Sequence, residues 1–103
     1  MVKMCTSQED FTSEVSKSCL TVVDFTASWC GPCQMIGPKF IAAAEKYTTV
    51  NFIKVDVDEC EDVAAECGIS AMPTFQFYKD GKKVDDFCGA DEGQLIQRIE
   101  KNM

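Results

Sequence analysis

The sequence predicts an α/β fold in which a mixed five-stranded sheet carries helices on both faces. Strand-like and helix-like segments alternate along most of the chain, a pattern typical of βαβ units. Residues 20–25 are almost continuously apolar and rich in β-branched side chains, as expected for a buried parallel strand. Near the C-terminus, two further strand-like segments flank Asp80-Gly81, a dipeptide that favours a two-residue hairpin turn. Together these patterns predict βαβ units followed by an antiparallel hairpin.

The first half of the chain contains two predicted strands and two predicted helices. A short strand is expected at residues 2–4. Residues 6–9, Thr-Ser-Gln-Glu, match a capping box that opens a helix. The apolar side of that helix is predicted to consist of Phe11, Val15 and Cys19. After the buried strand at residues 20–25, a second helix begins at residues 30–33 and is expected to bury Ile36, Phe40, Ala43 and Tyr47, with a kink at Pro38.

The second half contributes three strands and two helices. A strand at residues 51–57 precedes a helix that is expected to end at Gly68. One side of this helix is predicted to carry Cys60, Val63, Ala64 and Cys67. The hairpin strands are expected at residues 74–79 and 82–88. Asp91 is predicted to cap a last helix whose apolar positions include Leu95, Ile96 and Ile99.

Length, composition and charge limit the classes of function. The 103 residues predict a single domain, 1–103, that can bury a core without structural disulfides. A formal net charge of −7 with no cluster of Lys or Arg argues against binding to nucleic acid or anionic membranes, and is expected to keep a monomer in solution. No apolar segment resembles a membrane span or a signal peptide. Seven cysteines at scattered spacings do not match a secreted disulfide framework, so a cytoplasmic location is expected.

The most informative segment is Trp29-Cys30-Gly31-Pro32-Cys33, which places two thiols three residues apart where a strand gives way to a helix. In a first helical turn this spacing brings the two Cα atoms to roughly 5–6 Å, which a disulfide tolerates. Gly31 allows close access to the thiols, and Pro32 suits the turn because it needs no N–H. Cys30 would lie at the helix N-terminus, where unpaired N–H groups and the helix dipole stabilise a thiolate. We therefore expect Cys30 to be the nucleophile of a dithiol/disulfide pair.

Two other interpretations of the Cys-x-x-Cys segment are a zinc site and an inert buried pair. A zinc site needs about four ligands, usually a second Cys-x-x-Cys or a pair of histidines. The chain has no histidine and no second Cys-x-x-Cys. Neither interpretation is favoured, and we expect no bound metal.

Asp24 is an acidic residue in the middle of the most apolar strand. An ionised carboxylate at such a place is costly unless it is paired or hydrated, so its pKa is expected to be raised. A buried acid of this kind has either a proton-transfer role or a purely structural one, bonded to a neighbouring group.

The combination of residues 27–33, Asp24 six residues before Cys30, and the segment Met72-Pro73-Thr74-Phe75 resembles the thioredoxin family from about residue 2 to the C-terminus. The resemblance implies the thioredoxin fold, with strand order 1-3-2-4-5 and four flanking helices. It implies a protein-disulfide reductase that cycles between a Cys30/Cys33 dithiol and disulfide. It also implies that no cofactor is bound, and that an NADPH-dependent flavoprotein thioredoxin reductase recharges the protein.

The resemblance also implies roles for residues around the thiols. Asp24 would accept the proton of Cys33, with Lys54 as its counter-ion; a lysine that extends to solvent is the alternative for Lys54. The Met72–Pro73 peptide bond would be cis, with the Met72 backbone available to a substrate strand. The implied substrate-binding residues are Trp29, Met72, Pro73, Thr74, Gly89 and Ala90.

Five cysteines lie outside the motif. Cys5 and Cys19 are expected to be small apolar core residues. Cys60, Cys67 and Cys88 are candidates for redox regulation, and a disulfide-linked dimer on oxidation is a further expectation. Two alternative functions stay open: a thiol-regulated binding module of the same fold, and a disulfide oxidase or isomerase domain. Pro32 argues against the last, because such domains usually carry histidine between the thiols.

Overall fold

The computed structural model describes residues 2–103 and contains five strands and four helices within them. In chain order these are β1 (Val2–Cys5), α1 (Gln8–Val15), β2 (Thr21–Thr26), α2 (Gly31–Lys46), β3 (Asn51–Asp56), α3 (Glu61–Glu66), β4 (Thr74–Lys79), β5 (Lys82–Cys88) and α4 (Glu92–Asn102). The sheet has the order β1-β3-β2-β4-β5. The strand order expected from the family resemblance is confirmed.

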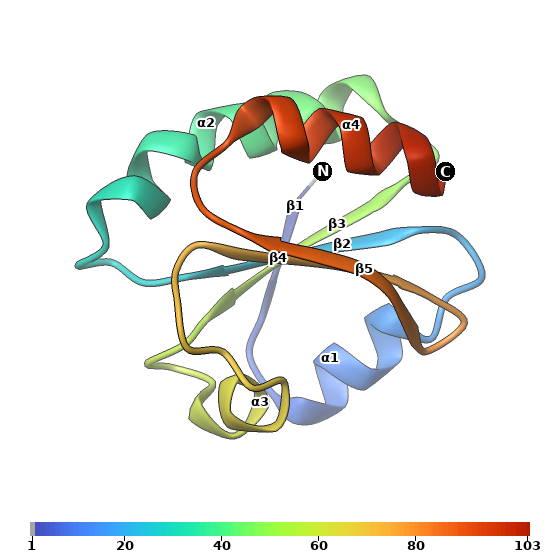
Figure 1. Cartoon of the computed structure of the whole chain (residues 1–103). Helices are drawn as coiled ribbons and strands as arrows, with labels where there is room; N and C mark the ends of the chain where they lie inside the picture. The colour runs from blue at the N-terminus through green and yellow to red at the C-terminus, as the bar shows by residue number, and fades with distance from the viewer. Residues whose placement is uncertain (1) are drawn as a thin grey trace.

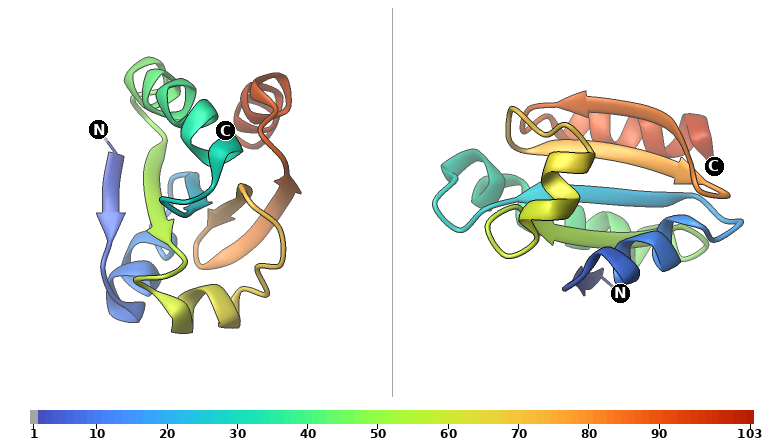
Figure 2. Two further views of the ribbon diagram at one scale, coloured as in Figure 1. Left: turned by 90° about the vertical axis from the view of Figure 1, so that its left-hand side faces the viewer. Right: turned by 90° about the horizontal axis from the view of Figure 1, so that it is seen from below.

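The helices cover both faces of the sheet, with α2 and α4 on one side and α1 and α3 on the other (Figures 1 and 2). Strands β1, β3 and β2 are parallel, β4 runs antiparallel to β2, and β5 runs antiparallel to β4. The strand β5 therefore has the same direction as β1, β2 and β3, so the expectation from the resemblance that both hairpin strands oppose the others is wrong for β5, because a hairpin reverses the chain once more. Because β2 is central and pairs on both edges, its six residues are all buried. The predicted parallel strand without an exposed face is therefore confirmed, beginning one residue later than expected.

Each face of the sheet has its own apolar core, because successive side chains of a strand point to opposite sides. The core under α2 and α4 includes Val22, Phe40 and Phe75. The core under α1 and α3 includes Val23 and Phe25. Asp24 is two residues from Val22 on β2, so both side chains point to the same face of the sheet, the one that α2 covers.

Three details differ from the sequence-based prediction. The helix α1 is capped by Ser7, whose hydroxyl accepts the Asp10 N–H at 3.1 Å, and not by a box that starts at Thr6. Asp10 itself accepts the Thr6 N–H at 3.3 Å, so its carboxylate binds the residue before the N-cap and not the N-cap N–H that a reciprocal capping box uses. The helix ends at Val15, which leaves Cys19 exposed in the following turn; its prediction as a core residue is wrong.

The third difference is the length of α3. It spans only Glu61–Glu66, with Cys60 as its N-cap and Cys67 as its C-cap, so the two cysteines flank the helix instead of lying within it. Val63 is the residue of α3 that is buried in the core. Gly68 follows with φ = +69°, which confirms the predicted end, since glycine adopts this conformation without a steric cost.

The hairpin and the last helix agree with prediction. Asp80 and Gly81 have φ values of +52° and +81°, as a two-residue turn of this type requires. The Asp91 carboxylate accepts the Gln94 N–H at 3.1 Å and caps α4. No helix in the stretch 2–103 combines the length and apolarity needed to cross a membrane.

Candidate active site

Cys30 is the cap of α2 and Cys33 lies in its first turn. A short loop leads from the end of β2 to this turn (Figure 2, right). Cys30 is the N-cap residue in an extended conformation, and Pro32 lies in the first helical turn. The Cys30 sulfur accepts the Cys33 backbone N–H at 3.2 Å. The sulfur therefore lies in the position that an N-cap side-chain oxygen normally takes.

The two cysteines form a disulfide in this structure, with Cα atoms 5.3 Å apart. This confirms the expectation that residues at this spacing can be bridged within the turn. Both residues are buried and pack with Ala27, and the partly buried Val57 and Met72 close over them. Gly31 and Pro32 are exposed, so the turn itself faces solvent.

Asp24 is 1% exposed, and neither of its carboxylate oxygens has a hydrogen-bond partner among residues 2–103. Burial raises its pKa to about 7, and the positive charge of Lys54 opposes that rise. The pKa of this carboxyl group therefore lies in the neutral range. This agrees with the expected direction of the shift.

Lys54 is the Cα partner of Asp24 on the neighbouring strand β3, so both side chains point to the face covered by α2. The Lys54 ammonium lies beneath α2, next to Gly37. A Cβ atom at position 37 would lie 3.7 Å from the Lys54 nitrogen. Within the described part of the chain no ion pair of 4.0 Å or less joins Lys54 to Asp24. The lysine thus acts on the charge of Asp24 from a distance and leaves its oxygens unbonded.

The Met72–Pro73 peptide bond is cis, as the resemblance implied. The Pro73 carbonyl accepts the Gly89 N–H at 2.9 Å, which joins the segment before β4 to the loop after β5. The Thr74 hydroxyl donates to the Ala71 carbonyl and lies 3.6 Å from the Cys88 sulfur. Two loops that are far apart in sequence are therefore held side by side next to the disulfide.

Trp29 is 67% exposed, and its indole N–H donates to the Asp58 carboxylate at 2.7 Å. Sequence reasoning did not single out Asp58, because nothing in the sequence connects the loop after β3 to the residue before Cys30. Met35 on α2 is 69% exposed and extends this apolar surface. Together with Ala90 it lines a groove of about 170 Å³. In the sequence, the available signal for this surface was the position of a tryptophan directly before Cys30 and of a methionine two residues after Cys33.

The other cysteines lie in different environments. Cys5 is buried as expected, and Cys60 is buried with its thiol donating to the Cys5 carbonyl at 3.4 Å. Burial raises the pKa of both thiols, that of Cys5 to about 11. Cys88 is exposed at the end of β5.

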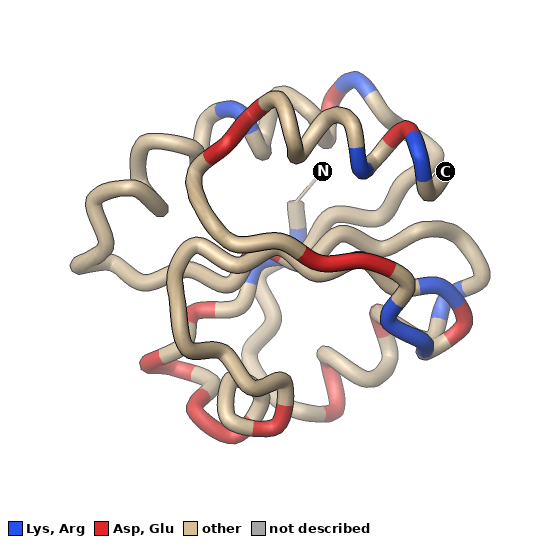
Figure 3. Tube along the Cα trace, viewed as in Figure 1, with Lys and Arg blue, Asp and Glu red and all other residues tan. Residues whose placement is uncertain are grey.

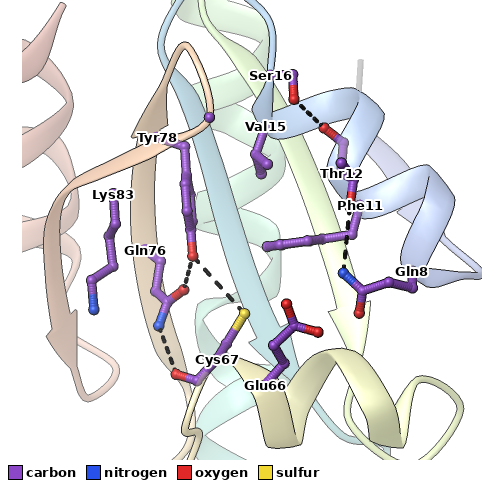
Figure 4. A pocket seen from close by; sticks show the side chains of 11 residues that line it. Gln8, Phe11, Thr12, Val15, Ser16, Glu66, Cys67, Gln76, Tyr78 and Lys83 are labelled. Atoms are coloured by element: carbon purple, nitrogen blue, oxygen red, sulfur yellow. Dashed lines mark hydrogen bonds between the residues drawn. The ribbon is translucent and has the colours of Figure 1, made fainter.

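Cys67 lies on the opposite side of the sheet from α2, at a pocket of about 360 Å³ between α1, the end of α3 and the hairpin (Figure 4). Its sulfur is 3.9 Å from the Tyr78 hydroxyl, which donates to Gln76. Burial raises the pKa of Cys67, although the contact with Tyr78 partly offsets this. In the described range no group of three His, Cys, Asp or Glu side chains is arranged to hold a metal ion.

Comparison with known proteins gives a consistent result. The thioredoxin family model matches residues 2–101. The thioredoxin of Equus caballus is 53% identical over 101 residues, which are 96% of each chain. A solved structure of Plasmodium falciparum thioredoxin superposes with a TM-score of 0.94 at 46% identity, covering 98% of this chain and 99% of that one. Mitochondrial thioredoxin 3 from Saccharomyces cerevisiae, in its oxidised form, superposes with a TM-score of 0.92 at 37% identity, covering 97% and 94%.

Thioredoxins are protein-disulfide reductases that bind no cofactor, and the family implies a thioredoxin reductase and substrate proteins as partners. The fold and the position of the dithiol turn agree with this family throughout the matched range. The chain therefore belongs to the thioredoxin family and is a protein-disulfide reductase with its redox-active disulfide between Cys30 and Cys33.

Proposed function

We propose that Cys30 is the attacking thiol of the reductase reaction and Cys33 the resolving thiol. In the dithiol form, the Cys30 thiolate attacks one sulfur of a substrate disulfide, and the second substrate sulfur leaves as a thiolate. Cys33 then attacks the Cys30 sulfur of the mixed disulfide, which closes the Cys30–Cys33 bond and releases the substrate as a dithiol. The substrate gains two electrons and two protons, and the protein loses the same number.

The position of the Cys30 sulfur carries this assignment. It accepts a backbone N–H at the start of a sixteen-residue helix, where the helix dipole also favours negative charge. Cys33 is the third residue past the cap and is the more deeply buried of the two, 2% exposed against 6% for Cys30. A negative charge is therefore favoured on Cys30 more than on Cys33.

Cys33 needs a proton acceptor before it can resolve the mixed disulfide, and we assign this role to Asp24, directly or through water. Its pKa of about 7 suits proton transfer near neutral pH, and its two oxygens are not committed to other groups within residues 2–103. Lys54 is the proposed counter-ion, because its charge favours the ionised carboxylate.

We place substrate docking on Trp29, Met72, Pro73, Thr74, Gly89 and Ala90. The bond between Gly89 and Pro73 and the exposure of Trp29 support one continuous surface beside the disulfide. An extended substrate segment would lie along this surface and bond to the Met72 backbone like an added strand. Gly31 and Pro32 would contact the substrate cystine, since they are the exposed residues between the thiols.

The proposed partner for recharging is an NADPH-dependent flavoprotein thioredoxin reductase, and the proposed working form is a cytoplasmic monomer. Single domain organisation over residues 1–103 is part of the same proposal. Cys67 and Cys88 are proposed as secondary redox-sensitive thiols, and Cys60 as one that reacts only after local opening, because it is buried. The exposed Cys88 offers a site for a disulfide-linked dimer on oxidation.

Insulin reduction coupled to thioredoxin reductase and NADPH tests the proposal. We expect continuous NADPH consumption with the wild-type protein and none with Cys30→Ser. A protein that binds its partners but does not turn over NADPH would be a thiol-regulated binding module instead. A protein that introduces disulfides into reduced ribonuclease faster than it reduces insulin would be an oxidase.

A further inference from the structure

The face around the disulfide is bordered by carboxylates from two separate segments. Six exposed acidic residues lie in the segments after β3 and at the start of α4: Asp58, Glu59, Glu61, Asp62, Asp91 and Glu92. Figure 3 shows both segments in red. Lys39 is the exposed cation nearest to them on α2, with its nitrogen 4.0 Å from the Glu92 carboxylate. Gln34, directly after the disulfide, is neutral.

A cluster of four lysines, Lys17, Lys79, Lys82 and Lys83, lies at the other end of the molecule, around the hairpin turn. Lys79, Lys82 and Lys83 border this turn, and the Lys17 carbonyl accepts the Asp80 N–H at 3.0 Å. Because β4 runs antiparallel to β2, its end lies beside the start of β2, far from the turn that carries the thiols (Figure 1). The molecule extends up to 29 Å, whereas charges in physiological salt are screened beyond roughly 8 Å. These lysines therefore do not offset the acidic border at the disulfide.

Two of the acidic residues are placed at the docking surface itself. Asp58 is held by the Trp29 indole N–H at 2.7 Å, and its own N–H donates to Asp56 at 2.9 Å. Glu92 lies at the groove of about 170 Å³ that Met35 and Ala90 also line. A carboxylate thus lies beside an exposed apolar side chain at two places on this surface, Asp58 at Trp29 and Glu92 near Met35.

We propose that this protein preferentially reduces protein disulfides flanked by lysine or arginine, and discriminates against disulfides flanked by acidic residues. The proposal rests on the docking surface given above. Lysine or arginine residues next to the substrate disulfide would be attracted electrostatically to the acidic border as the substrate approaches. In the bound complex they would lie close to Asp58 or Glu92. Such complementarity acts mainly on the association rate and the choice of partner, and it weakens as salt is added.

Three cystine peptides with identical loops and Lys-Lys, Ser-Ser or Glu-Glu flanks provide the test. The pre-reduced full-length protein is mixed with each peptide, and the single tryptophan, Trp29, reports oxidation in a stopped-flow fluorimeter. At 20 mM salt we expect the Lys-flanked peptide to react about tenfold faster than the Glu-flanked one, falling to about twofold at 500 mM. Each rate is divided by that of dithiothreitol with the same peptide, which removes the intrinsic reactivity of the disulfide.

A pair of double variants separates local charge from net charge. Glu59→Gln/Glu92→Gln removes two acidic residues of the border and leaves the Asp58 bond to Trp29 in place. Glu9→Gln/Glu45→Gln is the matched control, since it removes two exposed acids elsewhere, and Glu9, like Glu92, lies in the first turn of a helix. We expect the normalised Lys/Glu ratio to fall at least threefold in the border variant and to stay unchanged in the control.

The outcomes distinguish this proposal from the one on which it rests. A wild-type protein that reduces none of the three peptides would contradict the docking and thiol roles. Reduction of all three with a normalised ratio near one, or with a ratio that neither salt nor the border variant changes, would overturn the charge preference alone. An equal loss in both double variants would show that net charge, and not the acidic border, is responsible.

Discussion

Replacing Asp24 with Asn should stabilise the protein at neutral pH, because it removes a carboxylate that is buried without a hydrogen-bond partner among residues 2–103. The pKa of Asp24 is raised from 3.8 to about 7, chiefly by burial. A rise of about three pH units corresponds to about 4 kcal/mol between the two protonation states, at 1.36 kcal/mol per unit. This is a large part of the total stability of a small domain.

The sign of the effect depends on pH in a defined way. Below pH 3.8 the carboxyl group is protonated in both the folded and unfolded states, so its ionisation costs nothing. Between pH 3.8 and about 7 the unfolded chain loses the proton and the folded protein keeps it, so the free energy of unfolding falls as pH rises. Above pH 7 both states are ionised and the cost stays constant. Asp24→Asn should therefore gain stability over wild type from pH 4 to pH 7 and hold that gain at pH 8.

Urea unfolding of the oxidised wild-type and variant proteins at pH 4, 5, 6, 7 and 8 measures this difference. The change with pH is the informative quantity, because the buried asparagine amide adds a constant cost of its own. Asp86→Asn, at an exposed aspartate on β5, is the matched control and should show no comparable trend. A stability difference that is the same at pH 5 and pH 8, or that decreases with pH, would refute the reasoning.

Three other predictions follow from the same structure. Cys33→Ser should accumulate mixed disulfides with substrate proteins and Cys30→Ser should not, as non-reducing gels would show; equal trapping would remove the assigned roles. Glu14→Gln should lose about 1–3 kcal/mol of stability at pH 7, because the buried Glu14 carboxylate accepts three hydrogen bonds. These bonds outweigh burial and lower the pKa of Glu14 below its ordinary value of 4.5, so the loss should shrink as pH falls from 4.5 through the lowered pKa of the folded protein, which acid-range urea unfolding can check. Phe40→Ala should cost about 3–5 kcal/mol in urea unfolding, because Phe40 is fully buried against two aromatic rings; a loss under 1 kcal/mol would contradict this packing.

Local patterns were sufficient wherever a short segment determines its own conformation. Asp80-Gly81 adopts the predicted turn because few other dipeptides tolerate two consecutive positive φ angles. Cys30 and Cys33 lie in one helical turn because residues three apart in a helix are neighbours, whatever surrounds them. The continuously apolar β2 is buried because no side of it could face water at low cost.

Sequence patterns failed where packing decides how far an element extends. The periodicity of residues 60–67 suits a two-turn helix, yet α3 stops at Glu66 and leaves both cysteines at its ends. Cys19 matched the apolar side of α1, but that helix ends at Val15, whose carbonyl accepts the Gly81 N–H of the hairpin turn. Helix ends are determined by caps and neighbours, which hydrophobic spacing does not encode.

The chemistry of this protein can be predicted from short runs of neighbouring residues: the dithiol, the turn that holds it and the acid in the strand before it. The folded structure sets what surrounds that chemistry. It brings Asp58 to Trp29 across 29 residues, joins Gly89 to Pro73, and leaves the Asp24 oxygens without partners in the described chain. The physical reason is that bonding chemistry and backbone turns depend on a few adjacent residues, whereas burial, charge and docking shape are properties of segments that meet only after the chain has folded.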